Sequence, residues 1–433
     1  MILKPILIKN GRVVDPANGI DFINDVLIID QKIAAVSQAI KDIPAESIII
    51  NADEKYVLPG LVDMHTHLRD PGRSDEETIA SGSRAAAAGG FTSIACMANT
   101  NPVADDAAVI EYIVSKAKAE GLVNVFPIGA VTKGQLGEEL AEMGKMIEAG
   151  AVAFSDDGNP IENADVFRHG IEYASQFGKI LICHCEEKTL SKGGSMNEGY
   201  LSTIFGLPGI PKESETVSIY RAIQLAKEYG RIHIAHVSCA ESVELIRQAK
   251  TKGVPVTCET APHYFTLTED EVEGYNTNAK MNPPLRTADD VSAVVEGLRD
   301  GTIDCIATDH APHSVDEKNV EFSLAAFGIV GLETAFPIIF TELIDTKVLT
   351  LFDAVAKLTL NPAKIIGINK GTLSVGADAD VTIIDPDRNH TINISKFISK
   401  SKNSPFDGWK VKSAVDTVIV GGRVVVHNSR LNI

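Results

Sequence analysis

The middle of the chain alternates short apolar runs with longer stretches of helical periodicity. Apolar runs bounded by glycine, proline or polar turn residues predict buried parallel strands, which are covered on both faces. We predict strands at 57–63, 91–98, 123–131, 152–156, 179–183, 231–235, 254–258 and 303–308, and helices at 105–120, 137–149, 164–177, 214–229, 240–252 and 287–300. Eight strands that alternate with helices are typical of an α/β fold of the (β/α)8 TIM barrel type. A doubly wound open sheet is the alternative.

The two ends of the chain carry a different pattern. Short β-like runs such as 25–29 and 417–426 are separated by turn signals such as Asn10-Gly11. Two β-rich ends around an α/β middle predict that the termini meet in one small β-sandwich domain. We expect this composite domain to comprise residues 1–58 plus 367–433, and the barrel to comprise residues 59–366.

One helix start is predicted from a capping pattern. Ser74-Asp75-Glu76-Glu77 has the serine and the glutamate, three residues apart, of a capping box. The helix that it opens is expected to end at Gly89-Gly90, because glycine commonly terminates helices.

Composition narrows the class of protein. A chain of 433 residues exceeds the size at which one core usually keeps growing, so a large domain with a smaller one is expected. The formal net charge of -18 argues against a nucleic-acid or anionic-membrane partner, because both require basic surfaces. An anionic substrate would therefore need local positive charge, which metal ions and an arginine can supply.

Two further features indicate the compartment. The first nine residues are too short and too interrupted for a signal peptide, and no apolar run reaches membrane-spanning length. We therefore expect a cytoplasmic protein. Six cysteines lack Cys-x-x-Cys spacing and lie in or beside predicted strands, so we interpret them as reduced core residues.

Polar residues gather where the predicted strands end. The segment Asp63-Met64-His65-Thr66-His67 leaves the first strand, and strand alternation turns His65 and His67 to the same side. Seven of the eleven histidines lie at such ends. In a barrel these ends surround one mouth, where active sites are built. Imidazole is a common metal ligand, so the pattern favours a metal site.

Sorting these residues by chemistry gives four histidines and two aspartates as ligand candidates: His65, His67, Asp157, His184, His236 and Asp309. Six ligands exceed what one catalytic zinc needs. They suit two ions that share a bridging carboxylate and a bridging water, which two cations would ionise near neutral pH. Asp156 competes with Asp157 for the bridging position. His263 and His310 are expected in packing or supporting roles, and His169 and His233 on helices or outward faces.

Four motifs carry a resemblance to a known family. They are Asp63-Met64-His65-Thr66-His67-Leu68-Arg69-Asp70-Pro71-Gly72, Asn99-Thr100-Asn101-Pro102, Asn278-Ala279-Lys280-Met281-Asn282-Pro283-Pro284-Leu285-Arg286 and Ala307-Thr308-Asp309-His310-Ala311-Pro312-His313. Together they resemble the type I (long, bacterial) dihydroorotases of the amidohydrolase superfamily, nearly end to end. Many relatives bridge their metals with a carboxylated lysine. Residues 153–158 offer none, and the resemblance maps an aspartate bridge to Asp157.

The resemblance implies an enzyme, a cyclic amidohydrolase. Its reaction would be the reversible zinc-dependent hydrolysis of dihydroorotate to N-carbamoyl-aspartate in pyrimidine biosynthesis, with two Zn²⁺ per subunit. Asp309 would accept the proton of the nucleophile and deliver it to the leaving nitrogen. Arg69 can clamp the substrate carboxylate through a bidentate fork. The resemblance adds Asn99 and His313 to the carboxylate contacts, Asn282 to the ring amide, and the backbone of Phe327 and Gly328.

Two other functions are compatible with the sequence. A hydantoinase or allantoinase would act on another cyclic amide, and an inactive barrel could scaffold aspartate transcarbamoylase. An inactive scaffold would be expected to have lost some of its metal ligands, yet all six candidate ligands are present. An active chain could also partner with that enzyme, and the family implies a homodimer. The charged segment 314–322 is expected to be a mobile loop over the mouth, with a static loop as the alternative.

Overall fold

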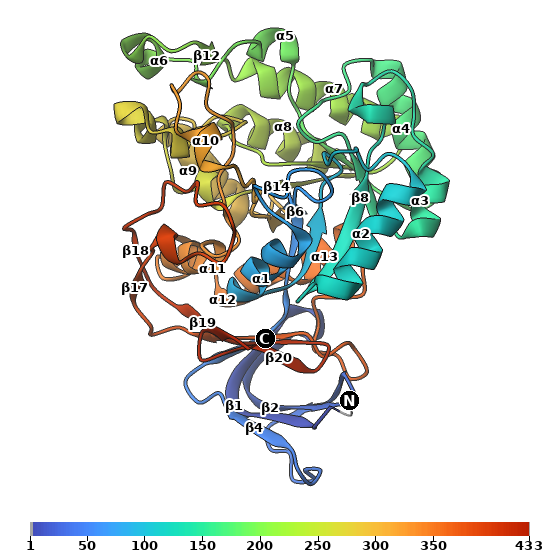
Figure 1. The fold of residues 1–433 in the computed structure, drawn as a ribbon, viewed down its shortest axis with the longest axis vertical. Coiled ribbons are helices and arrows are strands. Elements are labelled where there is room, and N and C mark those ends of the chain that lie inside the picture. Colours follow the sequence, from blue (N-terminus) through green and yellow to red (C-terminus); the bar gives the residue numbers. More distant parts are fainter. Residues whose placement is uncertain (1–2, 433) are drawn as a thin grey trace.

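The computed structural model describes residues 3–432 and shows two large sheets, one above the other in Figure 1. The upper sheet has eight parallel strands, and neighbouring strands follow each other in chain order. They are β6 (Leu61–Thr66), β7 (Phe91–Cys96), β8 (Asn124–Gly129), β9 (Ala153–Ser155), β10 (Leu181–Cys183), β13 (Ile232–Ile234), β14 (Val256–Thr260) and β15 (Cys305–Ile306). The predicted (β/α)8 barrel is confirmed, because a doubly wound sheet would reverse its strand order.

The barrel closes between its first and last strands. The backbone N–H of His67 donates to the carbonyl of His310 at 2.9 Å. The Asp63 carboxylate accepts from the backbone N–H of Thr308 at 3.2 Å and from its Oγ1 at 2.5 Å. The buried Asp63 side chain therefore completes the hydrogen bonding between the first and last strands of the barrel.

Helices surround the barrel (Figure 1). They are α1 (Ile79–Ala88), α2 (Ala107–Glu120), α3 (Met143–Ala149), α4 (Ala164–Gln176), α7 (Glu213–Tyr229), α8 (Ala240–Thr251), α9 (Ala288–Arg299), α11 (Ala335–Ile339), α12 (Leu351–Leu358) and α13 (Leu360–Ile366). Short helices α5 (Lys188–Ser191), α6 (Tyr200–Phe205) and α10 (Val315–Lys318) lie in loops above the strand ends, beside the short pair β11 (Met196–Asn197) and β12 (Gly209–Ile210). Five of the six predicted helix ranges are confirmed within two residues, and α3 begins six residues late.

The first predicted strand, 57–63, is in fact two strands. β5 (Tyr56–Pro59) belongs to the lower sheet, and β6 begins after Gly60. A side chain at Gly60 would lie 2.0 Å from Thr92 Oγ1, so only glycine fits where the chain crosses between the sheets. The continuous apolar run conceals this crossing, because both halves are buried.

The predicted capping box at Ser74–Glu77 is wrong. Helix α1 begins at Ile79, and Thr78 is its N-cap, with Ser81 completing the box. Glu76 and Glu77 are buried, and their carboxylates bind side chains from distant segments. Tertiary contacts take precedence here over the local pattern.

The lower sheet draws strands from both ends of the chain. Its order is β21-β20-β19-β16-β5-β1-β2-β3, and β4 pairs with β1. These strands are β1 (Ile6–Asp15), β2 (Ile20–Ile29), β3 (Lys32–Ser37), β4 (Ile48–Asn51), β16 (Val381–Asp385), β19 (Ala414–Val420), β20 (Arg423–His427) and β21 (Arg430–Leu431). A further short pair, β17 (His390–Thr391) and β18 (Lys410–Val411), lies apart from it. The boundaries 1–58 plus 367–433 and 59–366 stay a prediction.

Across residues 3–432, no helix combines the length and apolar character that a membrane crossing requires.

Candidate metal centre and substrate cavity

Asp157 lies at the centre of a group of histidines at the carboxyl ends of the strands. Its Oδ1 lies 3.5 Å from His65 Nε2, from His184 Nδ1 and from His236 Nε2. Its Oδ2 lies 3.5 Å from His67 Nε2. Four imidazoles from three strand ends thus face one carboxylate, and all five side chains are buried.

Asp156 points elsewhere. It accepts from the backbone N–H of Val131 at 2.7 Å and of Thr132 at 3.2 Å, and also binds the Thr132 hydroxyl. It therefore holds the loop after β8. Of the two neighbouring carboxylates, only Asp157 faces the histidines.

Asp309 faces the same group from the eighth strand. Its Oδ1 lies 3.1 Å from His67 Nε2 and 3.4 Å from His65 Nε2. Two sets of three potential ligand atoms result, and they share His65: one with Asp157 and His236, the other with His67 and Asp309. His65 Nε2 has one lone pair and can bind only one ion, whereas the two oxygens of a carboxylate such as Asp157 can each bind one.

Two of these side chains are carried on unusual backbone. His236 has φ +37° and Asp309 has φ +46°, in the left-handed region that is uncommon for residues other than glycine. Arg69, beside the group, has φ +56°. Such strain is a cost of order 1–3 kcal/mol per residue and tends to cluster at functional sites.

Polar side chains behind the histidines fix their ring orientation. Glu259 Oε1 lies 2.6 Å from His65 Nδ1, and Asn99 Oδ1 lies 2.9 Å from His67 Nδ1. Glu186 Oε2 lies 3.1 Å from His184 Nε2. In each ring one nitrogen is engaged from behind, so the other is directed at Asp157 or Asp309.

The electrostatics of the group favour positive charge among the carboxylates. Burial alone would raise the pKa of Asp309, but the imidazoles of His65 and His67 lower this pKa well below its usual range. Burial opposes a charged His65, but Asp309 and Asp157 raise its pKa well above the usual value. Burial likewise opposes a charged His184, yet Asp157 and Glu186 raise its pKa to about 10.

The unpartnered atoms test whether a metal fits. Among the described residues, buried His65 Nε2 and Asp157 Oδ1 have no hydrogen-bond partner, and both face the group. A buried polar atom without a partner costs about 1–3 kcal/mol, and a bound cation would remove that cost for both atoms. Imidazole nitrogens with carboxylate oxygens suit zinc and similar ions. The residues therefore fit a metal centre.

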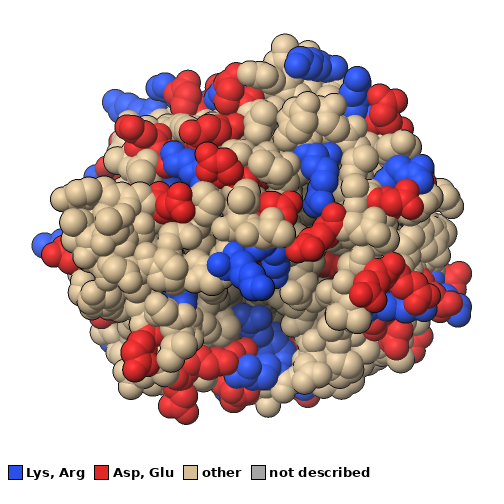
Figure 2. Space-filling model, turned by 90° about the horizontal axis from the view of Figure 1, so that it is seen from above, with Lys and Arg blue, Asp and Glu red and all other residues tan. Residues whose placement is uncertain are grey.

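A cavity of about 440 Å³ opens onto this centre. Arg69, Asn99, Asn282, His313 and Phe327 line it, together with Asp157 and Asp309. Gly328 does not line it, but a side chain there would lie 2.6 Å from the Ala311 carbonyl, so the close packing beside the cavity requires glycine. Figure 2 looks onto this face and shows basic side chains around a hollow, within a surface of mixed charge.

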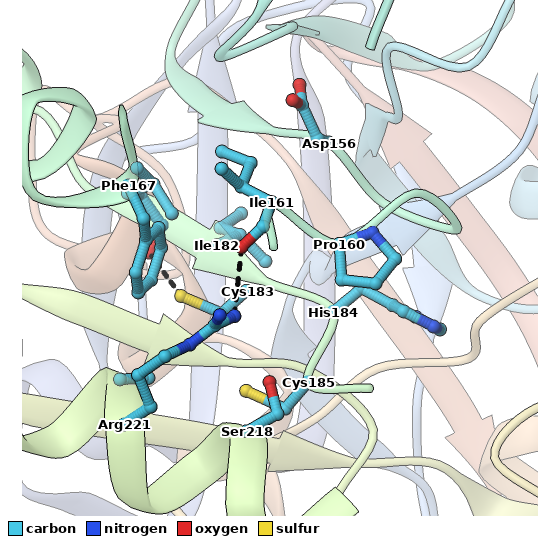
Figure 3. Close-up of a pocket in the computed structure, with 12 residues that line it drawn as sticks. Asp156, Pro160, Ile161, Phe167, Ile182, Cys183, His184, Cys185, Ser218 and Arg221 are labelled. Carbon is cyan, nitrogen blue, oxygen red and sulfur yellow. Dashed lines mark hydrogen bonds between the residues drawn. The ribbon is translucent and has the colours of Figure 1, made fainter. Parts of the chain in front are cut away.

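The opposite side of the fifth strand is apolar. Cys183 and Cys185 line a cavity of about 20 Å³ with Ile161 and Phe167, closed by Arg221, which donates to the Ile161 carbonyl at 2.9 Å (Figure 3). Strand alternation predicts this placement, because residues 183 and 185 turn away from the side that His184 uses. In Figure 3 the His184 ring extends away from both sulfur atoms.

The remaining histidines differ in outcome. His169 lies on α4 and is exposed, as expected. His233 is instead fully buried on β13, where its Nε2 lies 3.3 Å from Glu259 Oε2. The expectation of an outward-facing His233 is wrong, because the interior of the barrel provides a carboxylate for it. His310 contacts Glu77 at 3.3 Å, and His263 packs on Tyr264.

Arg69 pairs with a carboxylate other than its neighbour in sequence. Asp70 binds Lys116 at 3.0 Å, whereas Arg69 Nε lies 3.2 Å from Glu76 Oε2. Sequence reasoning overlooked Glu76, Glu186 and Glu259 as parts of the site. Glu186 and Glu259 could have been found from the sequence, because both lie directly at the end of a predicted strand. Glu76 gave a misleading signal, since it matched a capping pattern.

Comparisons with known proteins agree with this geometry. A family model described as dihydro-orotase-like matches residues 54–242, and one described as amidohydrolase family matches residues 281–426. The dihydroorotase of Pelotomaculum thermopropionicum is 57% identical over 98% of this chain and 99% of its own. The dihydroorotase of Acetivibrio thermocellus is 54% identical over 98% of this chain and 100% of its own.

Solved structures show the same fold in related enzymes. The L-hydantoinase of Arthrobacter aurescens superposes with a TM-score of 0.90 at 30% identity, covering 100% of this chain and 98% of its own. The dihydropyrimidinase of Brevibacillus agri has a TM-score of 0.85 at 24% identity, covering 99% of this chain and 96% of its own. The second likeness concerns the fold alone.

Proposed function

The chain belongs to the dihydroorotase family of the amidohydrolases, and from this premise we propose that it catalyses the reversible hydrolysis of dihydroorotate to N-carbamoyl-aspartate in pyrimidine biosynthesis. The observation that supports the proposal is that Arg69 and His313 line the same cavity as Asp309 and the histidine group, so that a substrate carboxylate and a hydrolysable amide could be bound side by side. A ring that bears a carboxylate beside a hydrolysable amide matches both halves of this cavity.

We propose that His65, His67, Asp157, His184, His236 and Asp309 hold two zinc ions per subunit, with Asp157 shared between them. Zinc supplies Lewis acidity and lowers the pKa of water toward neutrality when it is bound. The residues behind the histidines keep the ligand nitrogens directed inward, which reduces the entropy lost when an ion binds.

Asp309 is the proposed proton carrier. It lies on the eighth strand end, and its carboxylate borders the cavity where a substrate amide would sit. In the ring-opening direction it accepts a proton from the attacking water and delivers it to the ring nitrogen that leaves. In the ring-closing direction the same carboxylate takes the proton back from that nitrogen.

The remaining lining residues position the substrate. Arg69 donates a planar fork to the substrate carboxylate, and Asn99 and His313 flank it. Asn282 would contact the ring amide, and the backbone of Phe327 and Gly328 would complete the wall. Asn282 Nδ2 lies 3.4 Å from Glu186 Oε2, so its amide is already oriented beside His184.

Loss of ultraviolet absorbance from dihydroorotate tests this function, with metal content determined on the same sample. We expect turnover that chelation abolishes and zinc restores. A panel of hydantoin, allantoin and dihydroorotate separates the hydantoinase reading, since neither hydantoin nor allantoin carries the ring carboxylate that Arg69 would bind. Turnover of hydantoin in preference to dihydroorotate would contradict the proposal.

The family membership and the intact ligand set argue against an inactive scaffold. A homodimer and an association with aspartate transcarbamoylase are proposals that rest on the family alone. Light scattering of the pure protein tests the first, and co-elution with the transcarbamoylase tests the second. The cytoplasmic location stays a prediction.

A further inference from the structure

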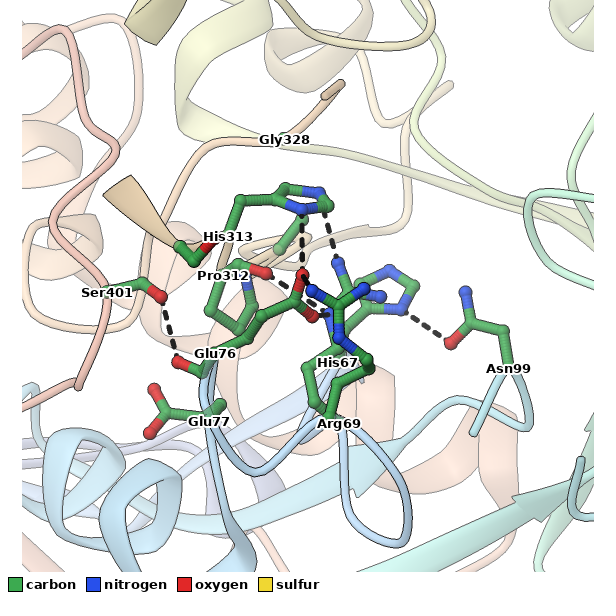
Figure 4. Close-up of polar contacts among 12 residues, drawn as sticks. His67, Arg69, Glu76, Glu77, Asn99, Pro312, His313, Gly328 and Ser401 are labelled. Carbon is green, nitrogen blue, oxygen red and sulfur yellow. Dashed lines mark hydrogen bonds and ion pairs between the residues drawn. The ribbon is translucent and has the colours of Figure 1, made fainter. Parts of the chain in front are cut away.

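Glu76 is a buried carboxylate that contacts two side chains of the cavity, Arg69 and His313. Its Oε2 lies 3.2 Å from Arg69 Nε, and its Oε1 lies 3.2 Å from His313 Nδ1. Only 2% of Glu76 is exposed. Figure 4 shows its carboxylate between the His313 ring and the Arg69 guanidinium. These two side chains come from the first and eighth strand ends, so Glu76 joins two loops.

The backbone that carries Glu76 is fixed independently. Ser401 Oγ donates to the Glu76 carbonyl at 2.8 Å, and the Glu76 N–H donates to the carbonyl of Arg73 at 3.0 Å. The backbone N–H of His313 donates to Asn403 Oδ1 at 3.1 Å. The segment around residues 401–403 thereby holds both loops, and Glu76 sets the side chains between them.

Glu76, His313 and Glu317 are close enough together to suggest a cation site. Their surroundings argue against one. Arg69 lies on Oε2 of Glu76, and Arg73 NH2 lies 3.1 Å from Oε1 and 2.8 Å from Glu317. A metal ion there would face two guanidinium groups, and both carboxylates already have cationic partners.

We propose that Glu76 is a positioning residue that holds Arg69 and His313 in the orientation that receives the substrate carboxylate. This inference rests on the proposed function, because it presupposes a carboxylated ring in the cavity. With Arg69 Nε and His313 Nδ1 engaged by Glu76, the outer guanidinium nitrogens of Arg69 are left for other contacts, while His313 Nε2 lies 2.8 Å from the Phe327 carbonyl. Arg69 NH2 and His313 Nε2 lie 3.3 Å apart, which places both beside the same point.

Positioning and simple charge predict opposite effects for Glu76→Gln. Removing a negative charge beside Arg69 would by itself strengthen the attraction for an anionic substrate. Glutamine, however, places an NH2 group against a guanidinium in either orientation, because Arg69 lies on Oε2 and Arg73 lies on Oε1. In one orientation Arg69 must turn away, and in the other the side of the group that Arg73 and His313 share is disturbed. If Glu76 acts by positioning, the KM for dihydroorotate rises even though the local charge becomes more positive.

Glu77→Gln is a matched control. Glu77 is equally buried and adjacent in sequence, but it binds Ser399, Ser81 and His310 rather than Arg69 or His313. Both variants remove one buried carboxylate, so general destabilisation affects both. Thermal unfolding of each variant measures that shared effect separately from binding.

The experiment measures kcat and KM for dihydroorotate in the wild type, Glu76→Gln, Glu76→Asp and Glu77→Gln. We expect Glu76→Gln to raise KM about 10- to 100-fold, the loss typical of a charge-assisted hydrogen bond, with kcat within about threefold. Glu76→Asp keeps the charge and should recover part of the loss. Glu77→Gln should leave KM within about twofold.

Each other outcome has a definite meaning. A lowered KM in Glu76→Gln would show a purely electrostatic role and overturn the proposal. An unchanged KM, or equal KM increases in Glu76→Gln and Glu77→Gln, would show a structural role and overturn it too. Wild-type protein without turnover of dihydroorotate would overturn the proposed function, and this inference with it. Active wild type with an unaffected Glu76 variant overturns the inference alone.

Discussion

Glu259 Oε1 lies 2.6 Å from His65 Nδ1, and its Oε2 lies 3.3 Å from His233 Nε2. One buried carboxylate thus joins a histidine deep in the barrel to a histidine of the candidate metal centre. The contact with Glu259 orients the His65 ring so that its Nε2 points at Asp157 and Asp309. Carboxylate support of this kind raises the basicity of a ligand histidine and fixes its tautomer.

Glu259→Gln should therefore weaken metal binding about 10- to 100-fold. The affinity can be measured without turnover, by competition between the protein and a chromophoric chelator for zinc. Thr257→Val serves as the control, because it removes the 2.8 Å contact between Thr257 and His233 Nδ1 and a 3.5 Å hydrogen bond to the Ile232 carbonyl but leaves the contacts of Glu259 in place. Equal affinities in Glu259→Gln and the wild type would contradict the orienting role.

Asp309→Asn tests the proton carrier. Asparagine keeps a ligand oxygen but cannot accept a proton, so kcat should fall about 10²- to 10⁴-fold. Metal content measured by elemental analysis should stay close to the wild-type value. Substantial residual turnover with full metal content would show that another group carries the proton.

Arg69→Lys tests the carboxylate clamp. Lysine keeps the charge but presents a single ammonium, so the planar fork is lost. KM should rise about 10-fold or more, and kcat should change less, because the contact is made in both the ground and transition states. Steady-state kinetics with dihydroorotate measures both, and a wild-type KM would exclude Arg69 from the substrate contacts.

A pH dependence of stability is expected from Lys318. Burial first, and then the charge of Lys280, lower the pKa of Lys318 to about 7. Its amine donates to the Ala326 carbonyl at 2.8 Å and holds the segment that leads to Phe327. In the unfolded chain the lysine pKa is about 10.4. Between these values the unfolded state binds more protons, so stability rises with pH and is lost as pH falls toward 7.

Urea unfolding of the wild type and Lys318→Met at pH 7, 8 and 9 measures this contribution. The difference in unfolding free energy between them should shift in favour of the wild type by about 1 kcal/mol for each pH unit. The comparison cancels the other titrating groups. A difference that does not change with pH would show that the buried amine keeps an ordinary pKa.

The sequence predicts the barrel well because its signals are regular. Buried strands alternate with amphipathic helices, and five helices begin and end within two residues of their predicted bounds. The candidate ligands could also be selected, because a barrel brings every strand end to one mouth. His184 and His236 are 52 residues apart, yet their rings meet with a 2.8 Å contact between Nδ1 and Nε2.

The errors have a common physical cause. At Gly60, in the Ser74–Glu77 segment and at His233, the neighbouring sequence favours one structure, whereas contacts from distant segments decide it. Thr92 limits the space at Gly60, and Glu259 provides a partner for a buried His233. Glu76 matched a local helix signal but is held by Arg69 and His313. Only the assembled fold contains this information.

The closure of the barrel affects when the enzyme can become active during its synthesis. The first and last strands are joined by Asp63 with Thr308 and by His67 with His310, within two residues of proposed ligands on both sides. A growing polypeptide that has not reached residue 309 has neither a closed barrel nor a complete ligand set. Formation of the active enzyme therefore depends on the last step of barrel closure. A chain that ends before this step would have an open barrel and no activity.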